Sequence, residues 1–179
     1  SPIKTYEDAW TLYRVIRAAN SFITEIAQAD FTRYEHSGGQ YQNWMKQLKY
    51  FPYEARVLRA FYYWILTETF GDTYYIDVPS SSIVMNPVKT SVSDIYQNMI
   101  SDLHWAITSK LSTQQNDGGR VTVWTAKALK ARLLLTRASV TKDAKMYEQA
   151  YNLAKDVIDN GPFEFAKDFA SIWDIKNSD

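Results

Sequence analysis

The fold of this chain is decided by residues 53–72, YEARVLRAFYYWILTETFGD. Apolar residues recur there at alternating steps of three and four, the spacing of one helical face, at Ala55, Leu58, Tyr62 and Ile65. From Phe61 to Leu66 every side chain is large and apolar or aromatic, so a helix is apolar on all sides there. A helix of that kind is packed on more than one face. We therefore expect an interior helix, ended by Gly71 in the left-handed conformation.

Three polar residues fall on apolar stretches of the predicted helices. The helical neighbours of the first, Arg59, include Ala55, Tyr62, Tyr63 and Leu66. Those of the second, Arg132, are Ala128, Leu129, Leu135 and Thr136. Such a guanidinium is either the tip of a side chain whose stem lies on apolar surface or a buried charge with a carboxylate partner. Asn20 lies on the apolar stripe of the first helix. We expect its amide to hydrogen-bond neighbouring backbone, with a ligand contact as the alternative.

Composition excludes several classes of function. A chain of 179 residues has the size of one domain, and its 20 basic and 20 acidic residues cancel. This balance lacks the basic footprint of a nucleic-acid-binding protein or of a protein attracted to anionic membranes. Cysteine is absent, which excludes disulfides and thiolate chemistry. No apolar run approaches the roughly 18 residues of a membrane span. No metal-ligand spacing surrounds His104, so we expect neither metal nor cofactor.

Aromatic residues form 15% of the chain. They serve either a helical core of large side chains or a surface that stacks on sugars or bases. The stacking candidates lie where aromatic and polar residues share an irregular segment. Residues 30–51 carry three of them, Tyr34, Tyr41 and Trp44, whose alternative role is to cap the ends of the long helices. The extended connection after residue 72 opens with the other two, Tyr74 and Tyr75.

Helices are expected over residues 6–29, 40–50, 53–72, 92–110, 123–138 and 144–160, with a short one after residue 163. The predicted boundary signals are capping boxes at Thr5-x-x-Asp8 and Ser91-x-x-Asp94, an N-cap at Thr122 and a stop at Gly161-Pro162. No apolar run of strand length alternates with these helices. Ala150 and Pro162 have the spacing of the second-helix alanine and terminal proline of a tetratricopeptide repeat. We expect an all-α fold of stacked helical hairpins, tetratricopeptide-like, with long irregular loops.

Five segments, in order, resemble the SusD/RagB-like family, the nutrient-binding outer-membrane lipoproteins of the Bacteroidetes type. They are Y-x-x-I-x-x-A-N from Tyr13, E-A-R-x-L-R-A through F-G-D from Glu54, D-L-x-x-A-I from Asp102, G-R-V-T…A-K-A-L-x-A-R-L-x-L from Gly119, and A-x-x-x-A-K-x-V-I-x-x-G from Ala150. Two features depart from the family pattern. Thr73-Tyr74-Tyr75 follows F-G-D in place of an apolar residue and a proline. The chain is also shorter than family members and has no lipidated cysteine.

This resemblance implies a single SusD-like helical domain over residues 1–179, a fragment of a longer chain. It implies a non-enzymatic protein on the outward face of the outer membrane that captures glycans or other nutrients for a SusC-like, TonB-dependent transporter. Contact with the membrane is through a lipid anchor absent from this chain. The resemblance also implies that Arg59, Arg132 and Asp102 are structural. We predict that one of the two arginines pairs with Asp102 or Asp72.

Two other functions stay open. A helical-repeat scaffold for protein–protein interaction is one, and an exposed apolar patch on the concave face would favour it. An all-helical glycosidase is the other, and it needs two carboxylates roughly 5–10 Å apart in a cleft. No local pattern marks such a pair, and no nucleophile–histidine constellation is visible. We therefore expect no catalytic residues.

Overall fold

The computed structural model of the chain describes residues 2–32, 39–48, 50–109, 111, 119–165 and 168–170. Within these ranges, the described part of the structure leaves out the side chains of residues 2–8, 27, 40, 41, 43, 44 and 46. The described elements are α1 (Pro2–Thr24), the 3₁₀-helix η1 (Ile26–Gln28), α2 (Gly39–Leu48), α3 (Phe51–Phe70), β1 (Thr73–Tyr74), β2 (Lys89–Thr90), α4 (Val92–Thr108), α5 (Val123–Thr141) and α6 (Ala144–Asn160).

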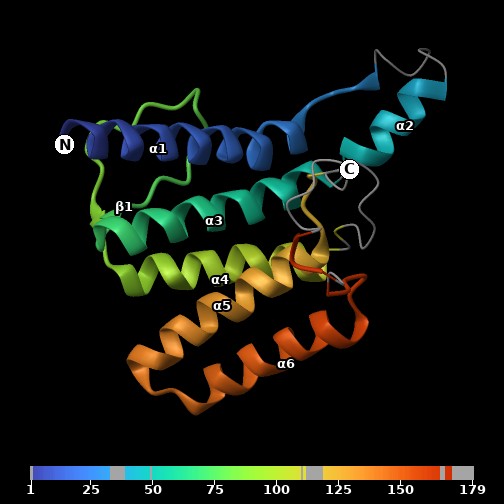
Figure 1. Ribbon diagram of the computed structural model, residues 1–179. Coiled ribbons are helices and arrows are strands. Elements are labelled where there is room, and N and C mark those ends of the chain that lie inside the picture. The colour runs from blue at the N-terminus through green and yellow to red at the C-terminus, as the bar shows by residue number, and fades with distance from the viewer. Residues whose placement is uncertain are drawn as a thin grey trace.

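The five long helices α1, α3, α4, α5 and α6 lie side by side and run in alternating directions (Figure 1). Each of them packs on the next along the chain, so the molecule is a row of helical hairpins. The short helix α2 lies to one side of the row, next to the start of α3 (Figure 1). This arrangement confirms the all-α fold of stacked helical hairpins that the sequence predicts.

Helix α3 is the interior helix that its sequence predicts. It packs against α1 on one side and α4 on the other, and Ala60, Tyr63 and Leu66 are buried along it. Its start lies two residues before the predicted one because Pro52 fits the first turn, where a missing N–H costs no hydrogen bond. Gly71 ends the helix with φ +71°, a left-handed value that glycine adopts without steric cost.

Polar side chains begin the next three helices, as the local sequence indicates. Ser91 accepts a hydrogen bond from the Asp94 N–H at the start of α4, and Thr122 forms a reciprocal capping box with Thr125 at the start of α5. The Asp143 carboxylate accepts hydrogen bonds from two backbone N–H groups at the start of α6. Each cap satisfies donors that the first helical turn leaves unpaired. The predicted bounds of α6, residues 144–160, are confirmed.

Other boundary predictions are wrong. Helix α1 begins at Pro2, so Thr5 lies inside the helix and is not its N-cap. Proline is favoured at a first helical position, which the capping-box pattern does not register. The helix ends at Thr24, and only the 3₁₀-helix η1 continues toward residue 29. Helix α5 runs three residues past its predicted end, to Thr141, where Lys142 takes a left-handed conformation. Most of the predicted tail helix lies outside the described residues.

The connection between α3 and α4 is extended, as predicted, but its ends also pair. Strands β1 and β2 form a two-stranded antiparallel ladder with Thr73 opposite Thr90 and Tyr74 opposite Lys89. The ladder closes residues 73–90 into one long loop, which we call the α3–α4 loop. Two-residue strands carry almost no periodicity signal, so the sequence does not show the pairing.

Candidate functional site

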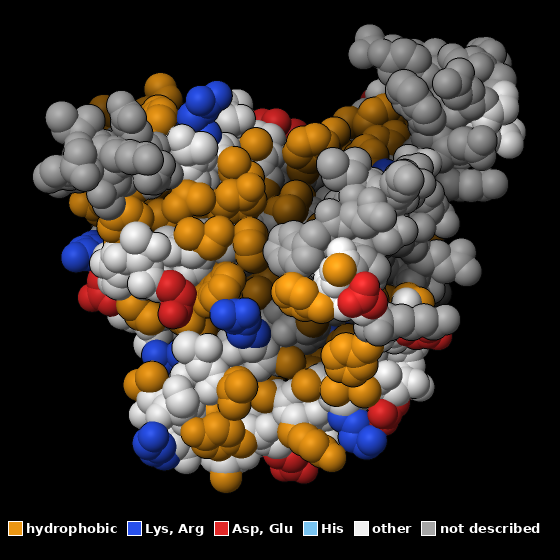
Figure 2. Space-filling model, in the orientation of Figure 1, with side chains coloured by type: hydrophobic (Ala, Val, Ile, Leu, Met, Phe, Trp, Pro, Cys, Tyr) orange, Lys and Arg blue, Asp and Glu red, His pale blue; other side chains and the backbone are white. Residues whose placement is uncertain are grey.

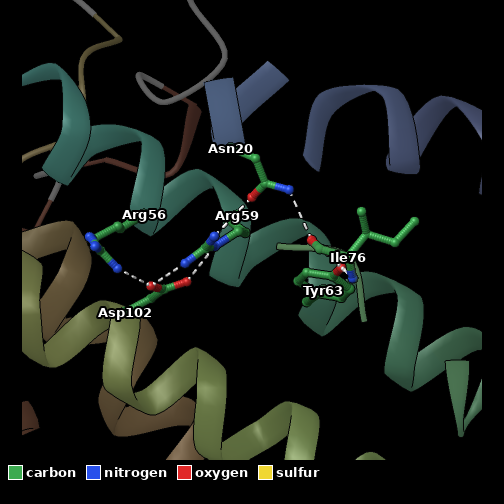
Figure 3. A network of polar contacts seen from close by, with 6 residues as sticks. All are labelled: Asn20, Arg56, Arg59, Tyr63, Ile76 and Asp102. Atoms are coloured by element: carbon green, nitrogen blue, oxygen red, sulfur yellow. Dashed lines mark hydrogen bonds and ion pairs between the residues drawn. The ribbon is translucent and has the colours of Figure 1, made fainter. Parts of the chain in front are cut away.

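A buried ion pair joins α3 to α4. Arg59 donates through Nε to Oδ2 of Asp102 and through a terminal nitrogen to Oδ1, both at 2.7 Å, and both side chains are buried (Figure 3). Arg56, one turn earlier on α3, donates to Oδ1 at 2.8 Å. The prediction that one of the two arginines pairs with Asp102 or Asp72 is confirmed. Two parallel hydrogen bonds from one guanidinium are the strong, geometrically specific form of such a pair.

Burial alone would disfavour the charged guanidinium of Arg59. The hydrogen bonds and the attraction of Asp102 outweigh that desolvation and leave the pKa of Arg59 above its ordinary value. The carboxylate of Asp102 is surrounded by two guanidiniums, so it is engaged in holding helices together. A catalytic acid or base would need a free face toward a substrate. We therefore assign Arg59 and Asp102 a structural role.

Asn20 extends this pair to the α3–α4 loop. Its Oδ1 accepts a hydrogen bond from Arg59 at 2.8 Å, and its Nδ2 donates to the carbonyl oxygens of Ile76 and Val78, each at 2.9 Å (Figure 3). The amide is completely buried and uses both of its ends. This confirms the expectation that Asn20 hydrogen-bonds neighbouring backbone. The polar network therefore runs from α4 through α3 and α1 to the loop.

Further polar side chains of α1, and that of Glu25 just after the helix, hold the same loop. Arg17 donates to the carbonyl oxygens of Pro79, Ser80 and Ser82. Ser21 accepts from the Ser80 N–H at 3.1 Å, and Glu25 accepts from the Ser81 hydroxyl at 2.6 Å.

The sequence patterns did not identify Arg17, Ser21 and Glu25 as contacts of the α3–α4 loop. The loop-holding side chains, including Tyr13 and Asn20, follow one another at steps of four, three, one and four, which is a helical face that continues one residue past α1. This polar stripe is the sequence feature that could have indicated a segment packed on α1.

Tyr75 is part of the packing between α3 and the loop. Its ring stacks on the ring of Tyr63, with centroids 4.8 Å apart and 29° between the planes. The hydroxyl of Tyr63 in turn hydrogen-bonds both the N–H and the carbonyl oxygen of Ile76. Burial raises the pKa of Tyr75 to about 12. Stacking on a sugar needs an open ring face, and one face of Tyr75 is already covered.

Tyr74 differs from its neighbour, because its side chain is 44% exposed. Its backbone is fixed on both sides by the hydroxyl of Tyr13, which donates to the Tyr74 carbonyl oxygen and accepts from the Tyr74 N–H, each at 3.0 Å. An exposed ring on a fixed backbone suits a stacking contact. Of the five predicted ligand residues, Tyr74 is the one whose described side chain has this geometry.

The other three predicted ligand residues lie elsewhere. Tyr34 is outside the described residues, and Tyr41 and Trp44 lie on α2 with side chains that are also outside the description. Helix α2 precedes α3, whereas β1 follows it. The 20 residues of α3 span about 30 Å, so the two predicted regions stand at opposite ends of a helix and cannot form one stacking platform.

Asp72 and Arg132 are not ion-paired in the described part of the chain, which corrects their predicted role. The Asp72 carboxylate accepts from the Val92 N–H at 2.9 Å and so stabilises the start of α4. The Arg132 guanidinium lies 4.6 Å from the centroid of the Trp64 ring, a cation–π contact, and its side chain is exposed. The prediction failed because the neighbouring Leu135 is itself exposed, so this face of α5 is not interior.

The outer part of the α3–α4 loop is apolar and uncovered. The side chains of Ile83, Met85 and Val88 are 82%, 80% and 77% exposed.

Among the described residues, no group of histidines and acids has the arrangement of a metal site. A search of the same residues finds no helix long and apolar enough to cross a membrane.

No protein-family model matches the sequence. A SusD-like protein of Bacteroides ovatus is 30% identical over 131 residues, which cover 70% of this chain and 23% of that protein. A crystal structure with xylogluco-oligosaccharide is 27% identical, with a TM-score of 0.76 over 95% of this chain. A SusD superfamily protein from Parabacteroides distasonis is 25% identical, with a TM-score of 0.77 over 92% of the chain. This chain belongs to the SusD-like family.

A third solved relative is surface glycan-binding protein A from Bacteroides fluxus, 26% identical with a TM-score of 0.72 over 95% of this chain. Residues 1–179 span only 32–34% of the length of these three solved structures. The SusD-like chain described here therefore corresponds to about one third of such a protein, and less of the Bacteroides ovatus relative.

Proposed function

We propose that the protein to which this chain belongs captures glycans at the cell surface, without catalysis, for import through a SusC-like, TonB-dependent transporter of the outer membrane. The observation that carries this proposal is the likeness, over 95% of the chain, to a crystal structure with xylogluco-oligosaccharide. Another solved relative of this chain, named surface glycan-binding protein A, supports a location at the cell surface. Attachment to the outer membrane through a lipid anchor belongs to the same proposal.

Within residues 1–179 we propose Tyr74 as a glycan contact. Its exposed ring, on a backbone that Tyr13 fixes next to β2, offers the flat apolar face on which a sugar ring stacks. Tyr41 and Trp44 on α2 stay candidates for a separate contact at the other end of α3. The half-buried position of Tyr75, stacked on Tyr63, gives it the supporting role of holding the loop against α3.

The test is calorimetric titration of the full-length protein with a panel of oligosaccharides, xyloglucan and laminarin fragments among them. A panel member should bind, and Tyr74→Ala should weaken its binding about threefold to tenfold, the effect of losing one aromatic stacking contact. Tyr74→Phe is the matched control, because it keeps the ring and should keep most of the affinity. Absence of binding to every member would contradict glycan capture. Equal affinity of Tyr74→Ala would contradict only the assignment of Tyr74.

A second candidate function, a scaffold for protein partners, is favoured by the exposed apolar side chains of Ile83, Met85 and Val88. Because glycan capture also involves the transporter, co-purification with the transporter is measured together with oligosaccharide affinity to show whether this loop is a protein contact. A triple serine variant at these positions should lose the transporter and keep oligosaccharide affinity if the loop contacts protein. Retention of the transporter by that variant would exclude the loop as the contact.

A further inference from the structure

The exposed indole of Trp105 has a charged partner on the neighbouring helix. Apolar side chains are spread over much of the surface in Figure 2, so the exposure of an aromatic ring does not by itself mark a site. Trp105 on α4 differs, because its 54% exposed side chain lies next to Arg56 of α3. The guanidinium carbon of Arg56 is 5.9 Å from the centroid of the indole ring. We call these two residues the indole–guanidinium pair.

Asp102 fixes the guanidinium of this pair. One terminal nitrogen of Arg56 donates to Oδ1 of Asp102 at 2.8 Å, and Arg59 holds the same carboxylate (Figure 3). The other two nitrogens of Arg56 make no hydrogen bond within the described residues, and the side chain is 27% exposed. A guanidinium carries five N–H donors in a rigid fork. Arg56 therefore presents unused donors in a fixed orientation beside the indole.

An unused amide lies on the same face of α4. Asn98 and Trp105 stand four residues before and three residues after Asp102, so the three share one side of the helix. The side chain of Asn98 is half-buried, and its amide makes no hydrogen bond to the described part of the chain. Asn98 and Trp105 are seven residues apart, which is about 10 Å along the helix axis.

The α3–α4 loop brings Tyr75 to the same place. Its hydroxyl has no hydrogen-bond partner among the described residues, and its pKa, raised chiefly by burial, also responds to nearby charges. These charges belong to Arg59, Asp102, Asp77 and Arg56. Two guanidiniums and two carboxylates balance one another, which favours an uncharged ligand over an anion or a cation.

The groups gathered here match the chemistry of a sugar ring. A sugar ring has a face of C–H groups that stacks on an aromatic ring, and it has hydroxyls at its rim that need donors and acceptors. Trp105 supplies the aromatic ring and Arg56 supplies donors. Asn98 and the hydroxyl of Tyr75 can both donate and accept.

We propose that Trp105, Arg56 and Asn98 form a subsite for a neutral oligosaccharide. This inference rests on the proposed function, glycan capture, and adds a contact separate from Tyr74. Arg56 and Phe70 are 14 residues apart on α3, about 21 Å, and Tyr74 lies beyond Phe70. One sugar ring therefore does not touch both places.

The test is calorimetric titration of the full-length protein with xyloglucan and laminarin fragments. For a fragment that the unmodified protein binds, Trp105→Ala and Arg56→Lys should each weaken binding about threefold to tenfold. Arg56→Lys keeps the positive charge beside Asp102 and removes the rigid fork of donors, and urea unfolding checks that its fold is intact. Arg132→Lys is the matched control, because Arg132 also lies over a tryptophan ring, that of Trp64, and its affinity should be unchanged.

The outcomes separate the subsite from glycan capture. Unchanged affinity of both variants for a bound fragment would overturn the subsite and leave glycan capture standing. Binding of no fragment by the unmodified protein would contradict glycan capture, and the subsite with it.

A second measurement needs no substitution. In hydroxyl-radical oxidation of the full-length protein, a saturating fragment should slow the modification of Trp105 at least about threefold. Met85 in the α3–α4 loop is 80% exposed and should react at the same rate with and without the fragment. An unchanged rate at Trp105 would overturn the subsite. So would a Trp105 that resists oxidation without any sugar, the sign that another part of the polypeptide covers it.

Discussion

Helices α3 and α6 both carry wide apolar surfaces, but their surroundings differ. Helix α3 lies between α1 and α4, and its charged residue Arg59 is buried with a full set of partners. Among the described elements only α5 packs broadly on α6, and the ion pair within α6, Lys155 with Asp159, is in water. From this comparison we expect the loss of unfolding free energy caused by a substitution to follow the number of helices packed around the substituted helix rather than the residue type. Four experiments sharpen or break this comparison.

The largest effect is expected for Asp102→Ala. Removal of this carboxylate leaves the Arg59 guanidinium charged and unpaired among apolar side chains, which costs ~3–5 kcal/mol of unfolding free energy. Asp159→Ala on α6 removes a carboxylate from a pair whose side chains are about half exposed, and its effect should stay within about 0.5 kcal/mol. Urea unfolding followed by circular dichroism measures both. Equal losses would break the comparison.

A core truncation on each helix should give the next difference. Leu66 of α3 is completely buried, so Leu66→Ala should cost about 2–5 kcal/mol through lost burial and the cavity left behind. Leu153 of α6 is half-buried against α5, and Leu153→Ala should cost about 1–2 kcal/mol because less surface is lost from the interior. The same unfolding experiment applies. A larger loss for Leu153→Ala would show that α6 is the more enclosed helix.

The third variant, Asn20→Ala, tests the link between α3 and the α3–α4 loop. It leaves one donor of Arg59 and the carbonyl oxygen of Val78 without this partner and the carbonyl oxygen of Ile76 with only the Tyr63 hydroxyl, which should cost ~1–3 kcal/mol. Amide hydrogen exchange should become faster at loop residues 76–82 and stay unchanged in α6. Asn152→Ala, on the exposed side of α6, should change stability by less than about 0.5 kcal/mol. Unchanged exchange in the loop would show that Asn20 does not hold it.

The smallest effect concerns pH. Burial raises the pKa of Tyr75 to about 12 from the ordinary value of 10.0, because it disfavours the phenolate. The unfolded chain therefore loses this proton first as the pH rises, binds fewer protons than the native protein, and becomes relatively more stable. Between pH 9 and pH 10.5 the contribution of Tyr75 should lower the unfolding free energy by about 0.8 kcal/mol. Tyr75→Phe should show a smaller fall over that range, and an identical fall would contradict the assignment.

Local patterns in the sequence predicted much of the fold. The apolar spacing of residues 53–72, the Gly71 stop and the Ser91 cap each act within one or two helical turns, so neighbouring residues reveal them. The Arg59–Asp102 pair was also predictable, because a guanidinium on a buried face needs a carboxylate.

Contacts between distant parts of the chain were harder to predict. The polar stripe of α1 hydrogen-bonds a loop some 60 residues later in the chain. No local sequence pattern predicts which distant segment will pack on such a stripe. The exposed position of Arg132 was missed for a related reason: the face of a helix that becomes interior depends on where its neighbours lie. The two halves of the ligand prediction, on α2 and in the loop, are separated by the whole of α3 for the same reason.

The hydrogen bonds of Asn20 have a consequence for recognition. Because the buried amide of Asn20 donates to the carbonyl oxygens of residues 76 and 78 while it accepts from Arg59, the loop can leave α1 only if the buried Nδ2 loses both of its acceptors. The α3–α4 loop therefore loses its conformational entropy when the bundle folds, not when a ligand binds. Any molecule that meets Tyr74 finds a preorganised ring, and its affinity carries no penalty for arresting a mobile loop.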